Sequence, residues 1–210
     1  MNYTESHCDK FAIKARQLKT ELENGALLID VRFINSILKT GSIPKAIFIG
    51  VQGNLESWSY YLIENKSVKI FLLKEETSDY QELKQRFEHA GFYNVQGFLE
   101  GGIDAWSLEG FETEPYHAIN PKDFVNNFNT INPELIIDVR SVREYANQHI
   151  VGSQNIPLEN LHQFITKLKA ENQFYIICAG GYRSIIAASI LKQNSIFKTV
   201  DVYGGIKNFP

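Results

Sequence analysis

Residues 177–184 combine a nucleophilic side chain with features that would activate it. They read Ile-Cys-Ala-Gly-Gly-Tyr-Arg-Ser and join a short apolar run to a segment of helical periodicity. A cysteine between a buried strand and a helix faces the unpaired N–H groups and the positive dipole end of that helix. These surroundings favour the thiolate, the reactive form of cysteine, whereas an isolated cysteine is more often a small buried apolar residue. We therefore predict that Cys178 is a catalytic nucleophile.

The residues that follow Cys178 are suited to holding an anion. Two successive glycines let the backbone curl so that several N–H groups point inward. Arg183 would add a positive charge at the edge of the pocket, and Ser184 could cap the helix or donate to the anion. We predict a substrate-binding loop that consists of Ala179, Gly180, Gly181, Tyr182, Arg183 and Ser184.

Composition argues against several other classes of function. The net charge is -3 and both signs are intermixed, so no basic surface for nucleic acid is expected. No apolar run reaches the roughly 20 residues that span a bilayer, and the polar N-terminus is unlike a targeting peptide. Two cysteines are too few for a disulfide framework, which favours a cytoplasmic protein. His7, Cys8 and Asp9 lack a second cluster with zinc-site spacing, so no metal site is expected.

The chain contains two copies of one pattern. At a shift of about 106 residues, three segments come into register in the same order, which is typical of duplicated domains. The paired segments are 27–32 with 135–140, 42–49 with 149–156, and 101–103 with 204–206. We interpret the chain as two domains, residues 1–112 and 117–210, joined by a linker that contains glycine and proline.

Each copy alternates short apolar runs with segments of helical periodicity. Runs such as 27–30 and 174–177 are typical of buried strands, and 80–90 and 158–168 are each predicted to form a helix with one apolar face. Asn120 before Pro121 predicts the start of another helix. This alternation predicts an α/β fold in which each domain has a mainly parallel sheet covered by helices on both faces.

Copy one differs from copy two at the predicted nucleophile. Its strand at residues 70–73 runs into Lys-Glu-Glu-Thr-Ser-Asp, with no cysteine and no glycine. The acidic side chains would repel an anion from the helix N-terminus. We therefore predict that the first domain is catalytically inactive and that residues common to both copies, such as the Asp-Val-Arg triplets, have framework roles.

Copy two resembles the rhodanese family along nearly its whole length. The resemblance is carried by Asp138-Val139-Arg140, Glu144-Tyr145, His149-Ile150 with Gly152, Asn155-Ile156-Pro157-Leu158, the loop from Cys178 to Ser184, and Gly204-Gly205-Ile206. It implies transfer of a sulfane sulfur through a persulfide of Cys178. The implied donors are thiosulfate or a glutathione-type persulfide, the implied acceptors are a thiol, sulfite or cyanide, and no cofactor is implied.

Two other functions compete with sulfur transfer. Cysteine phosphatases that share the rhodanese fold place five residues between cysteine and arginine, whereas four separate Cys178 from Arg183. The narrower loop favours a sulfurtransferase. Many rhodanese-like domains are non-enzymatic interaction modules, and copy one fits that description.

Copy one also resembles the inactive rhodanese of a group of bacterial fusion proteins. In those fusions a metallo-β-lactamase-type persulfide dioxygenase precedes an inactive and then an active rhodanese domain, and the order of the two copies here is the same. The resemblance rests on 49–58, 91–95 and 98–102. It implies that such a dioxygenase, as a further domain or a separate partner, works with this chain.

Overall fold

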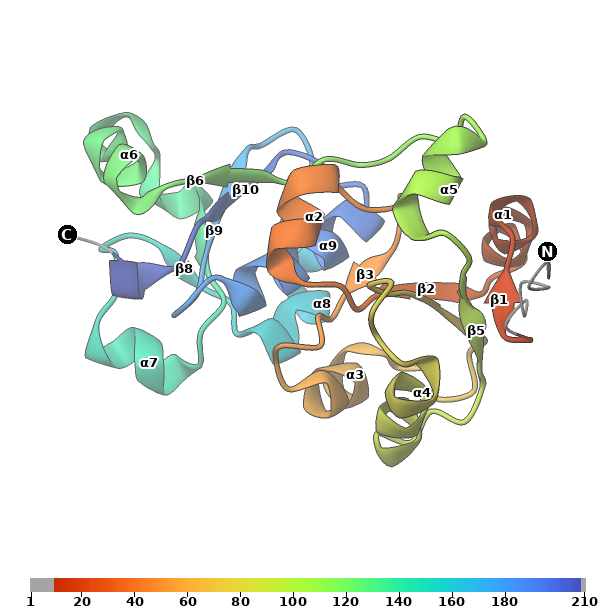
Figure 1. Ribbon diagram of the computed structural model, residues 1–210. Coiled ribbons are helices and arrows are strands. Elements are labelled where there is room, and N and C mark those ends of the chain that lie inside the picture. The colour runs from red at the N-terminus through yellow and green to blue at the C-terminus, as the bar shows by residue number, and fades with distance from the viewer. Residues whose placement is uncertain (1–9, 209–210) are drawn as a thin grey trace.

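The computed structural model of the chain describes residues 10–208 and contains two five-stranded sheets in which all neighbouring strands are parallel (Figure 1). The strand order is β1-β5-β4-β2-β3 in the first sheet and β6-β10-β9-β7-β8 in the second, so both copies have the same topology. The predicted α/β fold, with one mainly parallel sheet in each domain, is confirmed.

The first domain alternates strands and helices as its sequence predicts. Its strands are β1 (Ala12–Ile13), β2 (Leu27–Asp30), β3 (Ile47–Phe48), β4 (Ile70–Leu73) and β5 (Val95–Leu99), and its helices are α1 (Ala15–Glu23), α2 (Ile34–Thr40), α3 (Leu55–Leu62), α4 (Tyr80–His89) and α5 (Gly102–Leu108). Successive strand residues point to opposite faces, so Leu28 packs with α1 and α5 while Ile29 packs with α2, α3 and α4. Helices therefore cover both faces of this sheet.

The second domain has the same plan, with helices that are shorter apart from α9. Its elements are β6 (His117–Ile119), α6 (Pro121–Asn126), β7 (Ile136–Asp138), α7 (Val142–Asn147), β8 (Gln154–Asn155), α8 (Leu161–Phe164), β9 (Phe174–Ile177), α9 (Tyr182–Gln193) and β10 (Thr199–Val202). Short 3-10 turns lie at Phe128–Thr130, Pro133–Leu135, Leu158–Asn160, Ile165–Lys167 and Ile206–Asn208. The Asn120 side chain accepts a hydrogen bond from the Asp123 N–H, as the predicted helix start requires.

One predicted helix is wrong in its extent. The apolar periodicity of residues 158–168 predicts a single helix, but only Leu161–Phe164 is α-helical, with a 3-10 turn on each side. Leu158 and Leu161 are buried nevertheless. The burial that the pattern predicts is thus reached by three tight turns instead of one regular helix.

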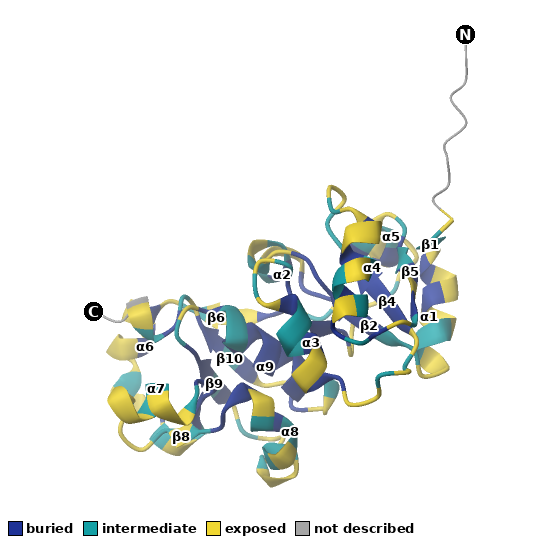
Figure 2. Cartoon of the chain, turned by 90° about the horizontal axis from the view of Figure 1, so that it is seen from below, coloured by how far each residue is buried: buried dark blue, intermediate teal, exposed yellow. Residues whose placement is uncertain are grey.

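Helix α9 lies between the two domains and is buried on nearly all sides (Figure 2). All residues from 184 to 192 are buried, which is typical of a helix that packs on both sides. On the side of the first domain, the Phe48 N–H donates to the Ser189 hydroxyl at 3.0 Å, and the Gln193 amide donates to the Lys45 carbonyl at 3.2 Å. The two domains thus share one core through this helix.

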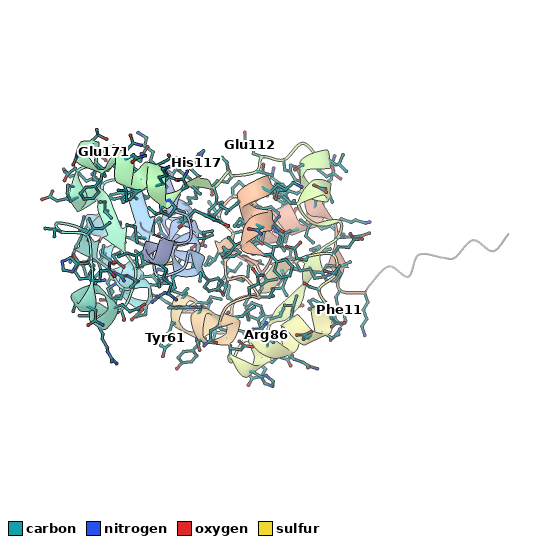
Figure 3. All side chains as sticks on the ribbon, turned by 60° about the vertical axis from the view of Figure 1, so that its left-hand side comes forward. Phe11, Tyr61, Arg86, Glu112, His117 and Glu171 are labelled. Atoms are coloured by element: carbon teal, nitrogen blue, oxygen red, sulfur yellow. The ribbon has the colours of Figure 1, made fainter. Side chains whose placement is uncertain are left out.

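The segment that connects the domains is packed against both of them. Figure 3 shows it running between Glu112 and His117. The Ser42 N–H donates to the Glu114 carbonyl at 2.9 Å, and the Lys192 ammonium donates to the Pro115 carbonyl at 2.7 Å. The connecting segment is therefore hydrogen-bonded to both domains. Its glycine and proline content predicts a linker but does not predict these contacts.

Each domain contains a buried aspartate–arginine pair at the end of a strand, β2 in the first domain and β7 in the second. Arg32 donates to both oxygens of Asp30, and Arg140 does the same to Asp138. The arginines also donate to the carbonyls of Gly41 and Gln148, at 2.7 and 2.6 Å respectively. The pairs thus tie the end of the strand to the following loop, which agrees with the framework role predicted for the Asp-Val-Arg triplets.

No helix within residues 10–208 is both long and apolar enough to cross a membrane.

We predict that Asp30→Ala lowers the free energy of unfolding by about 3–5 kcal/mol, because it leaves the Arg32 guanidinium buried without its counter-ion. The matched control is Lys69→Ala, which removes the partly exposed ion pair with Glu21 and should cost less than about 1 kcal/mol. Urea unfolding followed by fluorescence measures both changes. Equal losses for the two variants would contradict the framework role of the buried pair.

Candidate functional site

Cys178 is the first residue after strand β9 and lies at the start of helix α9. Its side chain is 1% exposed. The Gly181 N–H donates to its Sγ at 3.0 Å, and the Ser184 Oγ lies 3.3 Å from the same sulfur. Gly181 has a φ of 91°, a left-handed conformation that favours glycine and turns its N–H toward the sulfur. The sulfur therefore meets hydrogen-bond donors in a place where a thiolate would otherwise lose its solvation.

A second Gly-Gly turn holds the Cys178 loop from the side of strand β10. The Ile206 N–H donates to the Cys178 carbonyl at 2.9 Å. A Cβ at Gly205 would lie 2.3 Å from that carbonyl oxygen, and one at Gly181 would lie 3.0 Å from the Gly204 nitrogen. These contacts require close backbone packing, which glycine permits. The sequence did not reveal that the packing partner is the Cys178 loop.

Arg183 is held by Glu144 and is not a free cation at the rim. Its guanidinium donates to both carboxylate oxygens, at 2.8 and 2.7 Å. Hydrogen bonds from Arg183, opposed by partial burial, lower the pKa of Glu144 to about 2. The prediction that Arg183 offers its charge to an anion is therefore incomplete, because Glu144 from α7 already balances that charge.

The Tyr182 side chain leaves the loop and packs on the first domain. Its hydroxyl donates to the Gly50 carbonyl at 2.7 Å, and its ring meets Phe48 edge-on with centroids 6.1 Å apart. A Cβ at Gly53 would lie 2.1 Å from the ring. Burial raises the pKa of Tyr182, so the phenol remains a hydrogen-bond donor. The first domain thus anchors the first residue of α9.

A pocket of about 390 Å³ adjoins the loop and is lined by both domains. Gly180 and Gly181 form part of its wall, with Asn35 and Gln52 from the first domain and Lys207 after β10. A larger pocket of about 540 Å³ lies in the first domain around Trp106 and includes no residue of the Cys178 loop. We take the smaller pocket as the candidate site, because it adjoins the loop that carries Cys178.

The predicted site residues are only partly brought together. Gly181 and Ser184 contact the sulfur, and Gly180 and Gly181 line the pocket. The Ala179 carbonyl accepts from the Lys207 N–H at 3.3 Å, while the side chains of Tyr182 and Arg183 point to other partners. No group of three or more histidine, cysteine, aspartate or glutamate side chains within residues 10–208 is arranged to hold a metal. Cys8, with His7 and Asp9, lies outside the described part of the chain.

The corresponding loop of the first domain has the opposite polarity. Lys74 follows β4 as Cys178 follows β9. The Lys74 ammonium group donates hydrogen bonds to the carbonyl oxygens of Glu75, Glu76 and Ser78 at 2.9–3.4 Å. In the first domain, three carbonyl oxygens therefore point toward a cation. In the second domain, an N–H group points toward the Cys178 sulfur instead.

Comparison with known proteins decides the family. The sequence model of the Rhodanese-like domain matches residues 14–109 and again 120–209. The chain belongs to the rhodanese-like family. Each match covers four of the five strands of one sheet, so the chain is a tandem of rhodanese-like domains.

Several relatives match one domain's length of the chain. A putative sulfur carrier protein, YrkF of Bacillus subtilis, is 35% identical over 74 residues, which are 35% of this chain and 40% of YrkF. The thiosulfate sulfurtransferase GlpE of Stutzerimonas stutzeri is 27% identical over 73 residues, 35% of this chain and 67% of GlpE. Among solved structures, SSP1007 of Staphylococcus saprophyticus is 30% identical with a TM-score of 0.42, covering 45% of this chain and 93% of SSP1007. The match thus spans well under two thirds of YrkF.

We predict that Glu144 titrates near pH 2 in the folded chain, well below the ordinary value of 4.5. The folded pKa is depressed, so the ion pair contributes its full stabilisation above about pH 4.5 and loses it as the pH falls toward 2. A carboxyl NMR titration measures the midpoint, and Arg183→Ala should return it toward the ordinary value. A midpoint near 4.5 in the unaltered chain would show that Arg183 is free.

We predict that Gly53→Ala displaces the Tyr182 ring and loosens the loop, lowering the melting temperature and the reactivity of Cys178 together. The same substitution in a Tyr182→Ala background should have little effect, because the ring that meets the new methyl group is gone. Thermal unfolding and alkylation of Cys178 measure this difference. Additive effects of the two substitutions would mean that Gly53 does not act through Tyr182.

Proposed function

We propose that the chain is a sulfurtransferase in which Cys178 carries a sulfane sulfur as a persulfide. One observation carries the proposal: a buried cysteine sulfur accepts a hydrogen bond from a loop N–H at the start of a helix and next to a pocket. Membership of the rhodanese-like family and the similarity to the thiosulfate sulfurtransferase GlpE support sulfur transfer as the reaction. The proposed substrates are small sulfur-containing anions and thiols.

In the first half-reaction the Cys178 thiolate attacks the outer sulfur of the donor. With thiosulfate, a bond forms between Sγ and the outer sulfur while the bond between the two donor sulfurs breaks and sulfite leaves with that electron pair. With a glutathione-type persulfide, the glutathione thiolate leaves instead. Loop N–H groups would then stabilise the terminal sulfur anion of the persulfide, as they do other anions at such a nest.

In the second half-reaction an acceptor removes the outer sulfur. A thiolate, sulfite or cyanide attacks that sulfur, and its bond to Sγ breaks so that Cys178 returns as the thiolate. The cycle needs no metal and no organic cofactor, because the cysteine itself carries the transferred atom. Lys207 at the pocket supplies a positive charge for anionic donors and acceptors.

A cysteine phosphatase is the competing enzyme. Such an enzyme needs its arginine to clamp the phosphate oxygens, and here the Arg183 guanidinium already donates twice to Glu144. Four residues between Cys178 and Arg183 also make a narrow loop. Both features favour a sulfur anion over a phosphate.

The proposed roles of the two domains, residues 1–112 and 117–210, differ. The first is catalytically inactive, because Lys74 stands where a nucleophile would be and its loop is built around a cation. It serves instead as a support for the active loop through Tyr182 and as one wall of the pocket. The first domain can support the active loop and also serve as a non-enzymatic interaction module.

We also propose a cytoplasmic setting and a functional partner. A free thiol at Cys178 suits a reducing compartment. The likeness of the domain order to persulfide dioxygenase fusions suggests a metallo-β-lactamase-type dioxygenase, as a domain or a separate protein, that exchanges persulfide sulfur with this chain. Co-purification of the chain with such an enzyme tests this partnership.

We predict that Cys178→Ser abolishes sulfur transfer, because a serine hydroxyl cannot carry the persulfide. Cys8→Ser, the matched control, should retain activity within about twofold, as expected for a substitution outside the proposed site. Steady-state assays with thiosulfate and with glutathione persulfide, against thiol, sulfite and cyanide acceptors, measure both. A phosphate ester in place of the sulfur donor tests the competing enzyme: hydrolysis that depends on Cys178 would overturn the proposal.

A further inference from the structure

Asp201 is a buried acidic residue that the proposed sulfur chemistry does not use. It lies on β10, is 1% exposed, and neither carboxylate oxygen completes a hydrogen bond with any residue from 10 to 208. Burial raises the pKa of Asp201 to about 7, and the nearby Ser184 hydroxyl offsets part of that rise. The carboxyl group therefore changes its charge close to neutral pH.

Ser184 connects this carboxyl group to the cysteine. It is fully buried in the first turn of α9, with its Oγ 3.3 Å from the Cys178 sulfur. A hydroxyl group has one proton to donate and can accept at the same time. Ser184 can therefore donate either to the sulfur or to an ionised Asp201, but not to both.

Within residues 10–208, the other residues next to Asp201 offer its carboxyl group no charged partner. In the sheet it stands in register with Ile176 of β9 and Ala118 of β6, which are both apolar. On α9, Arg183 is the cation next to Ser184, and its guanidinium donates to Glu144. Cys178, reached through Ser184, is thus the titratable group to which Asp201 is connected.

The first domain has different residues at the positions that correspond to Cys178, Ser184 and Asp201. Lys74 stands at the place of Cys178, and Phe98 stands at the place of Asp201, since both come three residues before a Gly-Gly pair. The Lys74 ammonium lies 4.6 Å from the centroid of the Phe98 ring. Tyr80, six residues after Lys74 as Ser184 is after Cys178, packs on the same ring at 5.4 Å. An acid at this strand position therefore occurs here only together with the cysteine.

We propose that Asp201 is a positioning residue whose acid form donates to Ser184, so that the Ser184 hydroxyl donates in turn to the Cys178 thiolate. When Asp201 loses its proton, the Ser184 hydroxyl turns to the carboxylate and the thiolate loses a donor. The two anions disfavour each other, so cysteine and aspartate titrate as a coupled pair. The proposal deepens the proposed function, on which it rests for the thiolate at Cys178.

The test is the pH dependence of Cys178 alkylation by iodoacetamide in the full chain. The unaltered chain should show a profile broader than a single-proton titration, and Asp201→Asn, whose amide donates permanently, should show a single-proton profile. At about pH 8 the Asn variant should react more than about threefold faster, a change larger than the usual error of additivity between sites. That gain should disappear when Ser184→Ala is also present.

Thr199→Val is the matched control for these variants. Thr199 lies on the same strand face as Asp201, is also buried, and its hydroxyl likewise completes no hydrogen bond within residues 10–208. Its profile should superpose on that of the unaltered chain. Superposed profiles for Asp201→Asn and the unaltered chain, or an undiminished gain in the Ser184→Ala background, would overturn the proposal.

A second measurement covers the case in which Asp201→Asn does not fold. By carboxyl NMR, the midpoint of Asp201 should fall in a Cys178→Ala variant, because the thiolate that opposes its ionisation is absent. An unchanged midpoint would also overturn the proposal. Neither experiment uses sulfur transfer, so a failure of the proposed function would appear separately, as an absence of turnover with normal coupling.

Discussion

The burial of helix α9 from both sides is the constraint on which the rest of the structure depends. Its inner side packs on the second sheet and its outer side on the first domain, so the helix has few ways to move. The Cys178 loop is short and is fixed at the start of that helix, and Tyr182, the first helical residue, is hydrogen-bonded to the other domain. A rigid helix keeps the donor at Gly181 within hydrogen-bond distance of the sulfur without the loop having to be reordered when substrate binds. The first domain therefore helps to hold the Cys178 loop, although it has no cysteine at the corresponding position.

The two domains show how one fold can create opposite electrostatic environments. Both have the same strand order, the same buried aspartate–arginine pair and a loop between the fourth strand and the following helix. In one loop glycines turn an N–H group inward toward Cys178, and in the other a lysine gathers three carbonyl oxygens. The framework pairs lie at the strand ends in both, so the difference arises within a few loop residues. The first domain therefore keeps the same fold without a cysteine after its fourth strand.

Sequence alone predicted the fold and the placement of Cys178 between a strand and a helix because both depend on local patterns. Apolar runs such as 27–30 coincide with strands, and the spacing of Cys178, its glycines and the following helix is a local property. Partners that are distant in sequence were not predictable in the same way: Glu144 reaches Arg183 across 39 positions, and Gly50 reaches Tyr182 across 132. Asp201 gave no signal, because a single acid in a strand becomes notable only once the sheet and α9 bury it beside Ser184. The helix predicted over 158–168 failed for a related reason, since apolar spacing specifies a buried face but not the regularity of the backbone that presents it.

The most direct test of sulfur transfer through Cys178 is mass spectrometry of the chain after it has reacted with a slight excess of thiosulfate and been freed of small molecules. The account predicts one added sulfur atom, located on the peptide that contains Cys178, and its loss when sulfite or cyanide is then added. An unmodified Cys178 peptide from a folded chain, or an added sulfur found only on Cys8, would contradict it.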